Sequence, residues 1–120
     1  MTEVRRRLQS ARDRLAAAET LLASDYHPDA VSRAYYGVYE AARALLLVKN
    51  VETSTHAGVG NRLGFHYRDD IDTRSFSRLR SEREGCDYEL SEPSGERTRN
   101  CLQQVRSFVE QAEALVNGTS

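Results

Sequence analysis

One arginine interrupts the apolar face of a stretch with helical character, RLRSEREGCDYEL at residues 78–90. At about 100° per residue, four nearby apolar side chains fall within one arc of roughly 80°. Arg83 lies inside that arc, among Phe76, Leu79, Cys86 and Leu90. Because a guanidinium is planar and permanently charged, Arg83 is suited to bind phosphate or carboxylate oxygens.

Several arrangements would satisfy the charge of Arg83. A pair with Asp87, one helical turn later, contributes only a few tenths of a kcal/mol when exposed, and Glu84 or Arg80 can join it. That pair does not explain why Arg83 lies on the apolar face. Burial without a partner costs several kcal/mol, so the position requires a carboxylate from a partner helix or a polar cleft. A cleft between two copies of the bundle meets this requirement.

The three histidines do not form a recognisable metal site. His27, His56 and His66 lie on three different segments, and no two of them have the i, i+4 spacing of helix-borne ligands. The glycines of GVGNRLG have the spacing G-x-G-x-x-x-G and follow no strand, which excludes a phosphate loop. We therefore expect no metal and no cofactor.

Three tyrosines lie close together in the most apolar part of the chain. Tyr35, Tyr36 and Tyr39 span just over one helical turn and could form a stacking surface for nucleic-acid bases. Core packing is the simpler interpretation for Tyr35. The other two point in different directions, so at least one should meet a loop, another subunit or solvent. A protein partner explains such exposure better than RNA does.

Five amphipathic segments must position these residues. We expect helices over residues 3–23, from Pro28 to Asn50, from Ser54 or Thr55 to about Tyr67, from about Thr73 to Leu90, and from after SEPSGE to about Leu115. The second helix has the widest apolar face and should be central and most buried. No strand-like alternation is present. The pattern predicts an all-α, antiparallel four- to five-helix bundle.

Composition sets limits on the class of protein. A chain of 120 residues with 39% hydrophobic content fits a single domain over residues 1–120. The net charge of −1 provides no general attraction for nucleic acid, so any such contact must be local. Cys86 and Cys101 suit small core positions in a reducing compartment. With no signal-like or membrane-spanning run, we expect a soluble, cytoplasmic protein that does not bind membranes.

Three stretches in this order carry a resemblance to a known family: DAVSRAYYGVYEAARALLL, TSTHAGV and RSEREGCDYEL. The chain resembles, over nearly its whole length, the small prokaryotic HEPN proteins (higher eukaryotes and prokaryotes nucleotide-binding domain). The resemblance implies a four- to five-helix bundle that forms a homodimer. Many members carry R-x(4-6)-H on a late helix and cut RNA in the dimer cleft without a metal.

In the implied chemistry, arginine stabilises charge on the phosphate while histidine moves a proton at the ribose 2′-hydroxyl, which leaves a cyclic phosphate. Carried onto this chain, Arg83 takes the arginine position and Tyr88 stands where the histidine would be. A tyrosine with a pKa near 10 is a poor proton shuttle at neutral pH, so His56 or Asp87 are the candidates to replace it. The residues expected to contact RNA or nucleotide are Arg80, Arg83 and Tyr36.

The ending R-x-x-x-D-Y resembles HEPN proteins found beside a minimal nucleotidyltransferase. In related pairs that partner transfers AMP to a tyrosine near the motif, and Tyr88 would be the acceptor here. We therefore expect one component of a HEPN/nucleotidyltransferase, toxin-antitoxin-like module, acting on RNA or as the binding subunit of the nucleotidyltransferase. The alternatives are a metal-independent endoribonuclease toxin with an atypical motif and a non-catalytic helical dimerisation module.

Overall fold

Five α-helices make up the regular structure of the described residues. The computed structural model describes residues 2–90 and 92–118, and within those ranges it contains no strand. The helices are α1 (Thr2–Ala23), α2 (His27–Val48), α3 (His56–Tyr67), α4 (Arg74–Tyr88) and α5 (Gly95–Val116). The expected all-α bundle is confirmed.

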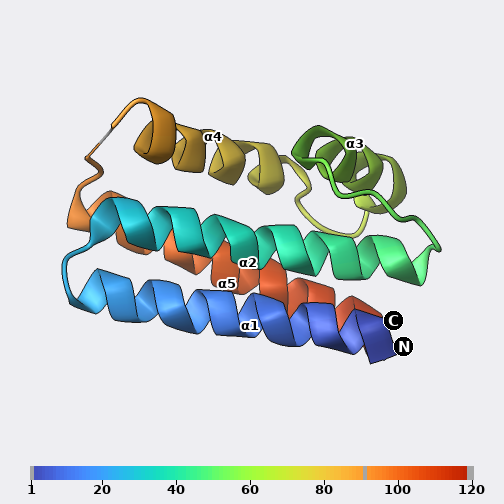
Figure 1. Cartoon of the computed structure of the whole chain (residues 1–120). Helices are drawn as coiled ribbons and strands as arrows, with labels where there is room; N and C mark the ends of the chain where they lie inside the picture. Colours follow the sequence, from blue (N-terminus) through green and yellow to red (C-terminus); the bar gives the residue numbers. More distant parts are fainter. Residues whose placement is uncertain (1, 91, 119–120) are drawn as a thin grey trace.

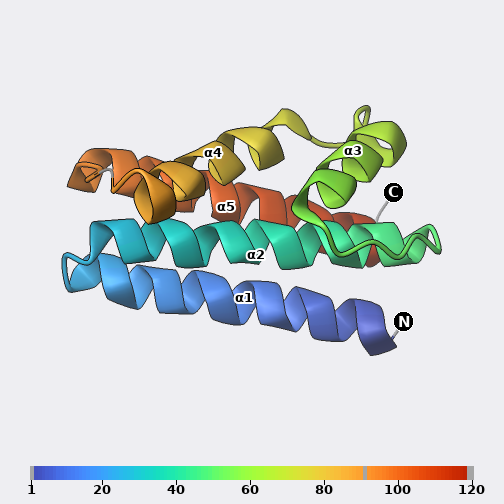
Figure 2. The same cartoon turned by 45° about the horizontal axis from the view of Figure 1, so that its top comes forward.

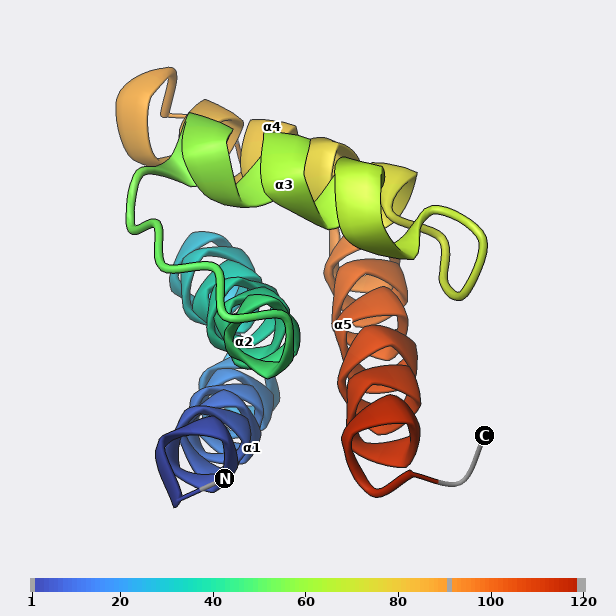
Figure 3. The same ribbon diagram turned by 90° about the vertical axis from the view of Figure 1, so that its right-hand side faces the viewer.

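The three long helices pack against one another as a bundle, and the two short helices cover one side of it. Figure 1 shows α1, α2 and α5 running along the bundle, with α4 and α3 above them. In the end view of Figure 3, α3 and α4 cross over α2 and α5. The start of α1 and the end of α5 lie at one end of the bundle, and the last turn of α4 lies at the other (Figures 1 and 2).

The second helix is the centre of the fold, as its wide apolar face predicted. It packs against each of the other four helices. Thirteen of its 22 residues are buried, so both of its sides are covered by neighbouring helices. At Gly37, an added Cβ would lie 3.3 Å from the Ala11 carbonyl oxygen and 3.3 Å from a Val105 methyl carbon. A larger residue there would push α1 and α5 away from α2.

The helix starts follow ordinary capping chemistry. Pro28 is the second residue of α2, where its missing N–H costs nothing. The Thr55 hydroxyl accepts a hydrogen bond from the Gly58 N–H at 3.0 Å and caps α3. Ser94 caps α5 in the same way, accepting from the Arg97 N–H at 3.1 Å. The Thr55 cap is important for the site because it fixes where α3 begins.

Two predicted helix ends were too far along the chain. We expected Asn50 and Leu90 to be helical, but both have left-handed backbone, with φ of 59° and 54°. After α2, the N–H groups of Asn50 and Val51 donate to the carbonyls of Leu47 and Leu46, at 3.0 and 2.9 Å, which closes the helix. Leu90 is 81% exposed, so its assignment to the apolar face of α4 was wrong.

An ion pair links α1 to α2 within the bundle of long helices. Arg7 Nη1 donates to both carboxylate oxygens of Glu40, at 3.0 and 3.2 Å. Glu40 is buried and Arg7 partly so. On the outside, Arg12 pairs with Glu113 and Arg106 with Glu19, which tie α1 to α5. These charge pairs thus link α1 to both α2 and α5.

Candidate functional site

Arg83 is buried between α4 and α2 and is surrounded by aromatic rings. The residue is only 5% exposed. Its guanidinium carbon lies 5.1 Å from the centre of the Tyr35 ring, 5.7 Å from Tyr36 and 5.6 Å from Tyr88. A desolvated cation over a ring is stabilised by about 2 kcal/mol. The three rings therefore supply much of the compensation that a buried charge needs.

One carboxylate completes the surroundings of Arg83. Arg83 Nη1 lies 3.5 Å from Asp87 Oδ2, and Ser32 Oγ of α2 donates to the same oxygen at 3.2 Å. The carboxylate thus comes from the same helix, one turn later, and the partner helix contributes a hydroxyl and rings. The predicted pair between Arg83 and Asp87 is therefore present, and the polar group that α2 adds to it is the Ser32 hydroxyl. Arg83 Nε is buried without a hydrogen-bond partner among the described residues.

His56 lies against the same tyrosines from the start of α3. Its ring centre is 5.5 Å from that of Tyr35, 4.8 Å from that of Tyr39 and 6.0 Å from that of Tyr36. His56 Nδ1 and the Tyr35 hydroxyl share a hydrogen bond of 2.6 Å. This bond occupies Nδ1 in either tautomer, so Nε2 is the ring nitrogen left to exchange a proton with a ligand.

The electrostatics of the site keep both partners of this bond neutral. Burial lowers the pKa of His56 below its ordinary value of 6.5, and the charges of Arg83 and Arg80 lower that pKa further. Burial raises the pKa of Tyr35, an effect that the charges of Arg83 and Arg80 oppose. At neutral pH the imidazole is therefore unprotonated and the phenol keeps its proton.

Tyr88, Arg80 and Tyr36 occupy the rim of this cluster. Tyr88, the last residue of α4, is 72% exposed although its ring reaches Arg83. Arg80 is partly buried, with Nε 3.7 Å from a Glu84 carboxylate oxygen. Tyr36 is partly buried and packs edge-on against Tyr35 at 5.3 Å. Each of these three side chains thus has a part that a ligand can reach.

The structure brings most of the sequence-predicted residues together. Arg83 contacts Asp87 and the rings of Tyr36 and Tyr88. His56 joins this group through its hydrogen bond with Tyr35. Arg80 lies close enough for its charge to lower the pKa of His56. For Tyr39, the expected loop contact is present, because its hydroxyl donates to the Ser54 carbonyl before α3.

Two members of the cluster were missed. Tyr35 was interpreted as core only, and it is fully buried, but it is also the residue that joins Arg83 to His56. Ser32 was not considered at all. A signal existed, because Ser32, Tyr35 and Tyr39 follow one another at spacings of three and four, which places three hydroxyl groups in one row along the helix.

Two further findings concern other kinds of site. Within residues 2–90 and 92–118, no group of three or more His, Cys, Asp or Glu side chains is placed to hold a metal ion. In the same part of the chain, none of the helices has the length and apolar content needed to cross a membrane.

Comparison with known proteins places the chain in a family. The family model of the HEPN domain matches residues 4–115. A Methanocaldococcus jannaschii protein named "Putative toxin MJ0605" is 31% identical over 113 residues, which cover 90% of this chain and 84% of that protein. A Thermotoga maritima protein named "UPF0332 protein" is 31% identical over 115 residues, covering 88% of this chain and 85% of its own length.

A third relative matches locally. A Pyrococcus horikoshii protein, "UPF0332 protein PH1297", is 37% identical over 65 residues, which cover 54% of this chain and 46% of that protein. The family model spans nearly the whole chain, and two relatives above 30% identity are covered over most of their own length. This chain belongs to the HEPN domain family.

Proposed function

We propose that this HEPN protein is a toxin that cleaves RNA without a metal, with Arg83 and His56 as its working groups. The observation that carries the proposal is that Arg83 and His56 both lie against the rings of Tyr35 and Tyr36. The sequence has tyrosine where the family motif has histidine, and His56 supplies an imidazole from another helix. A relative covered over most of its length is named as a toxin, which agrees with this role.

The chemistry follows from the two side chains. His56 Nε2 removes the proton of a ribose 2′-hydroxyl while Nδ1–H donates to the Tyr35 hydroxyl oxygen. The 2′-oxygen then forms a bond to the neighbouring phosphorus, and the bond from phosphorus to the 5′-oxygen breaks. The leaving 5′-oxygen takes up a proton from water, His56 later returns its proton to solvent, and a 2′,3′-cyclic phosphate remains. Arg83 stabilises the charge that builds on the phosphate oxygens.

Access to Arg83 requires a small movement. The guanidinium is covered in the single chain, and Tyr88 is the covering group that is itself mostly exposed. A phosphate reaches Arg83 when the ring of Tyr88 turns aside. The phosphate then replaces Asp87 as the partner of Arg83, and Asp87 keeps its hydrogen bond from the Ser32 hydroxyl. The neutral state of His56 is already set at pH 7.

Cleavage of a labelled single-stranded RNA in EDTA tests this function. We expect wild type to cleave and Arg83→Ala to cleave at least about 100-fold more slowly, as for other groups that stabilise a developing oxyanion. His56→Gln should be similarly impaired. Arg74→Ala, on the exposed first turn of α4, and His66→Gln, on α3, are matched controls that should retain activity. Equal cleavage by wild type and Arg83→Ala would rule the proposal out.

A second candidate function is favoured by the exposure of Tyr88. Its phenol projects from the end of α4 beside Arg83, and an incoming enzyme can reach it. In this role the chain is the binding subunit of a minimal nucleotidyltransferase. The Tyr88 oxygen attacks the α-phosphorus of ATP, loses its proton and releases pyrophosphate, which leaves AMP on the tyrosine. The AMP group would then cover Arg83.

Mass spectrometry distinguishes this role. After incubation with the nucleotidyltransferase and ATP, we expect one adenylyl group on wild type and none on Tyr88→Phe. Tyr26→Phe is the matched control, because Tyr26 is the other strongly exposed tyrosine among the described residues. Modification that persists in Tyr88→Phe would contradict the assignment.

We also infer that residues 1–120 act as one domain and form a homodimer. Tyr88, whose ring contacts Arg83, and Leu90, two residues later, are both exposed and provide apolar surface for a second copy. Analytical ultracentrifugation tests this, with Leu90→Ser expected to weaken the dimer without lowering the free energy of unfolding of the monomer. A wild type that sediments as a monomer at micromolar concentration would contradict it.

A further inference from the structure

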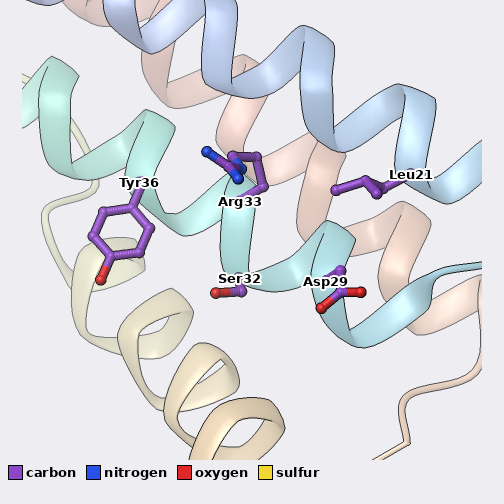
Figure 4. A pocket seen from close by; sticks show the side chains of 5 residues that line it. All are labelled: Leu21, Asp29, Ser32, Arg33 and Tyr36. Carbon is purple, nitrogen blue, oxygen red and sulfur yellow. The ribbon is translucent and has the colours of Figure 1, made fainter.

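An open pocket of about 410 Å³ lies beside the Arg83 cluster. It is lined by Leu21 from α1 and by Asp29, Ser32, Arg33 and Tyr36 from α2 (Figure 4). Its volume lies within the range of roughly 300–1,000 Å³ that is usual for small-molecule sites. The catalytic proposal uses none of its charged residues.

The pocket and the Arg83 cluster share a wall. Ser32 donates to the carboxylate that faces Arg83, and the Tyr36 ring lies 5.7 Å from the Arg83 guanidinium carbon. Arg83 is only 5% exposed, and its Nε has no hydrogen-bond partner among the described residues. An RNA strand with one phosphate at Arg83 would therefore place its next nucleotide over Ser32 and Tyr36.

The lining offers one group for each part of a nucleotide. The partly buried Tyr36 presents a ring for base stacking. Arg33 is exposed and can pair with a phosphate, while the exposed Asp29 carboxylate can accept from ribose hydroxyls. Among the described residues, the side chains of Asp29 and Arg33 have no hydrogen-bond or ion-pair partner. Both charges are thus available to a ligand.

The side chains that line the pocket surround it, with the aromatic ring at one end and the two charges on opposite sides. In Figure 4, Tyr36 lies at one end of the pocket, Arg33 on the side toward α1, and Ser32 and Asp29 on the opposite side. Asp29 precedes Tyr36 by two helical turns, about 10 Å of rise. A base on Tyr36 would place its ribose near the middle, between the cation and the carboxylate.

We propose that this pocket binds a ribonucleotide, the unit of an RNA strand next to the phosphate held at Arg83. Tyr36 stacks on the base of this nucleotide, Arg33 binds the phosphate of the same nucleotide, and Asp29 with Ser32 accepts a hydrogen bond from its 2′-hydroxyl. The last contact selects RNA over DNA, because the 2′-hydroxyl is the group by which the two sugars differ. This assignment deepens the proposed RNA-directed function and rests on it for the identity of the polymer.

Mononucleotide titrations followed by amide NMR shifts test the subsite without any bond to cleave. The ligands are AMP, dAMP and adenosine, added to the full chain. We expect shifts centred on residues 29–36, and a Kd for dAMP about fivefold weaker than for AMP, which corresponds to one lost hydrogen bond. Adenosine should be weaker still because it lacks the phosphate.

Three variants assign the contacts. Asp29→Ala should weaken AMP about fivefold and leave dAMP unchanged, whereas Arg33→Ala should weaken both alike. Arg5→Ala is the matched control and should change neither, because Arg5 is an exposed arginine in another pocket, formed by α1 and α5. Both pocket variants replace exposed side chains, and unchanged urea unfolding would show that they fold.

The outcomes separate this inference from the proposed function. Equal Kd values for AMP and dAMP in wild type, or shifts centred on Arg5, would overturn the subsite even if RNA is cleaved in EDTA. Pocket shifts that depend on protein concentration without nucleotide would overturn it in favour of a second copy covering this face. AMP binding with the expected pattern would support the subsite even if cleavage were absent.

Discussion

The hydroxyl oxygen of Tyr35 lies 2.6 Å from Nδ1 of His56, and the same tyrosine presents its ring to Arg83 at 5.1 Å. A fully buried residue of the central helix thus contacts the imidazole and the guanidinium at once. The hydrogen bond holds His56 at the start of α3, and the ring stabilises the charge of α4. Positioning of the site and packing of the core depend on one side chain.

Tyr35→Phe separates these two tasks. The ring and its contact with Arg83 remain, but the hydrogen bond to His56 is lost, so we expect the free energy of unfolding to fall by about 1 kcal/mol. RNA cleavage should also fall, though less than in His56→Gln. Urea unfolding and the cleavage assay measure the two effects. Wild-type stability together with wild-type cleavage would show that the bond positions nothing.

Stability should depend on pH through His56. Its pKa in the folded chain is lowered, so the unfolded chain, with a pKa near 6.5, binds the proton more readily. The contribution of neutral His56 to the free energy of unfolding is therefore complete above about pH 6.5 and is lost as the pH falls below that value. Urea unfolding at pH 7.5, 6.5 and 5.5 should show this loss in wild type.

The matched variants for this pH effect are His56→Gln and His66→Gln. The first should flatten the dependence below pH 6.5, whereas the second should leave it as in wild type. The reason is that His66 lies in the last turn of α3 and packs edge-on against the exposed Phe65, away from Arg83. An equal slope in wild type and His56→Gln would assign the effect to another group.

Arg83→Leu should leave the fold as stable as wild type, or stabilise it. A buried arginine with a single carboxylate at 3.5 Å has little surplus over its desolvation cost, and a hydrophobic residue of similar size fits an apolar face. The same variant should lose RNA cleavage. By contrast, Leu79→Ala on the same face should cost about 3 kcal/mol, which shows that this face of α4 is packed. Strong destabilisation by Arg83→Leu would make the arginine structural.

The Glu40 carboxylate should matter to stability and not to the site. Glu40→Ala leaves Arg7 half-buried without its two hydrogen bonds, and we expect a loss of about 2 kcal/mol. Glu3→Ala removes the exposed partner of the same arginine, 3.5 Å from its Nε, and should cost less than about 0.5 kcal/mol. Thermal unfolding of both variants measures the difference, and equal losses would show that burial of the pair is irrelevant.

The helices could be predicted from the sequence because their apolar spacing is regular. The wide apolar face of residues 28–50 predicted the central helix, and Arg83 indicated the candidate site because it interrupts the apolar pattern of α4. Helix ends were less predictable. Asn50 and Leu90 continue the spacing, but a left-handed residue ends each segment, and hydrogen bonds to earlier carbonyls stabilise that end after α2.

Only some of the contacts in the Arg83 cluster could be predicted from the sequence. His56 is separated from Tyr35 by 21 positions, and its approach depends on the Thr55 cap and on the path of residues 49–55. The pair of Arg83 with Asp87 on its own helix was among the predicted arrangements. The burial of Arg83 by rings was not predicted, since a sequence does not show which faces of α2 and α4 meet. The residue types were visible, but their contacts depend on tertiary packing.

The placement of the chain ends has a practical consequence. The start of α1 and the end of α5 lie at the end of the bundle opposite the last turn of α4 (Figure 1). The 22-residue α2 separates the two ends by about 30 Å. An affinity handle or fluorescent fusion attached before α1 or after α5 should therefore leave the exposed side chain of Tyr88 accessible, so that immobilised protein can still capture RNA or a partner enzyme.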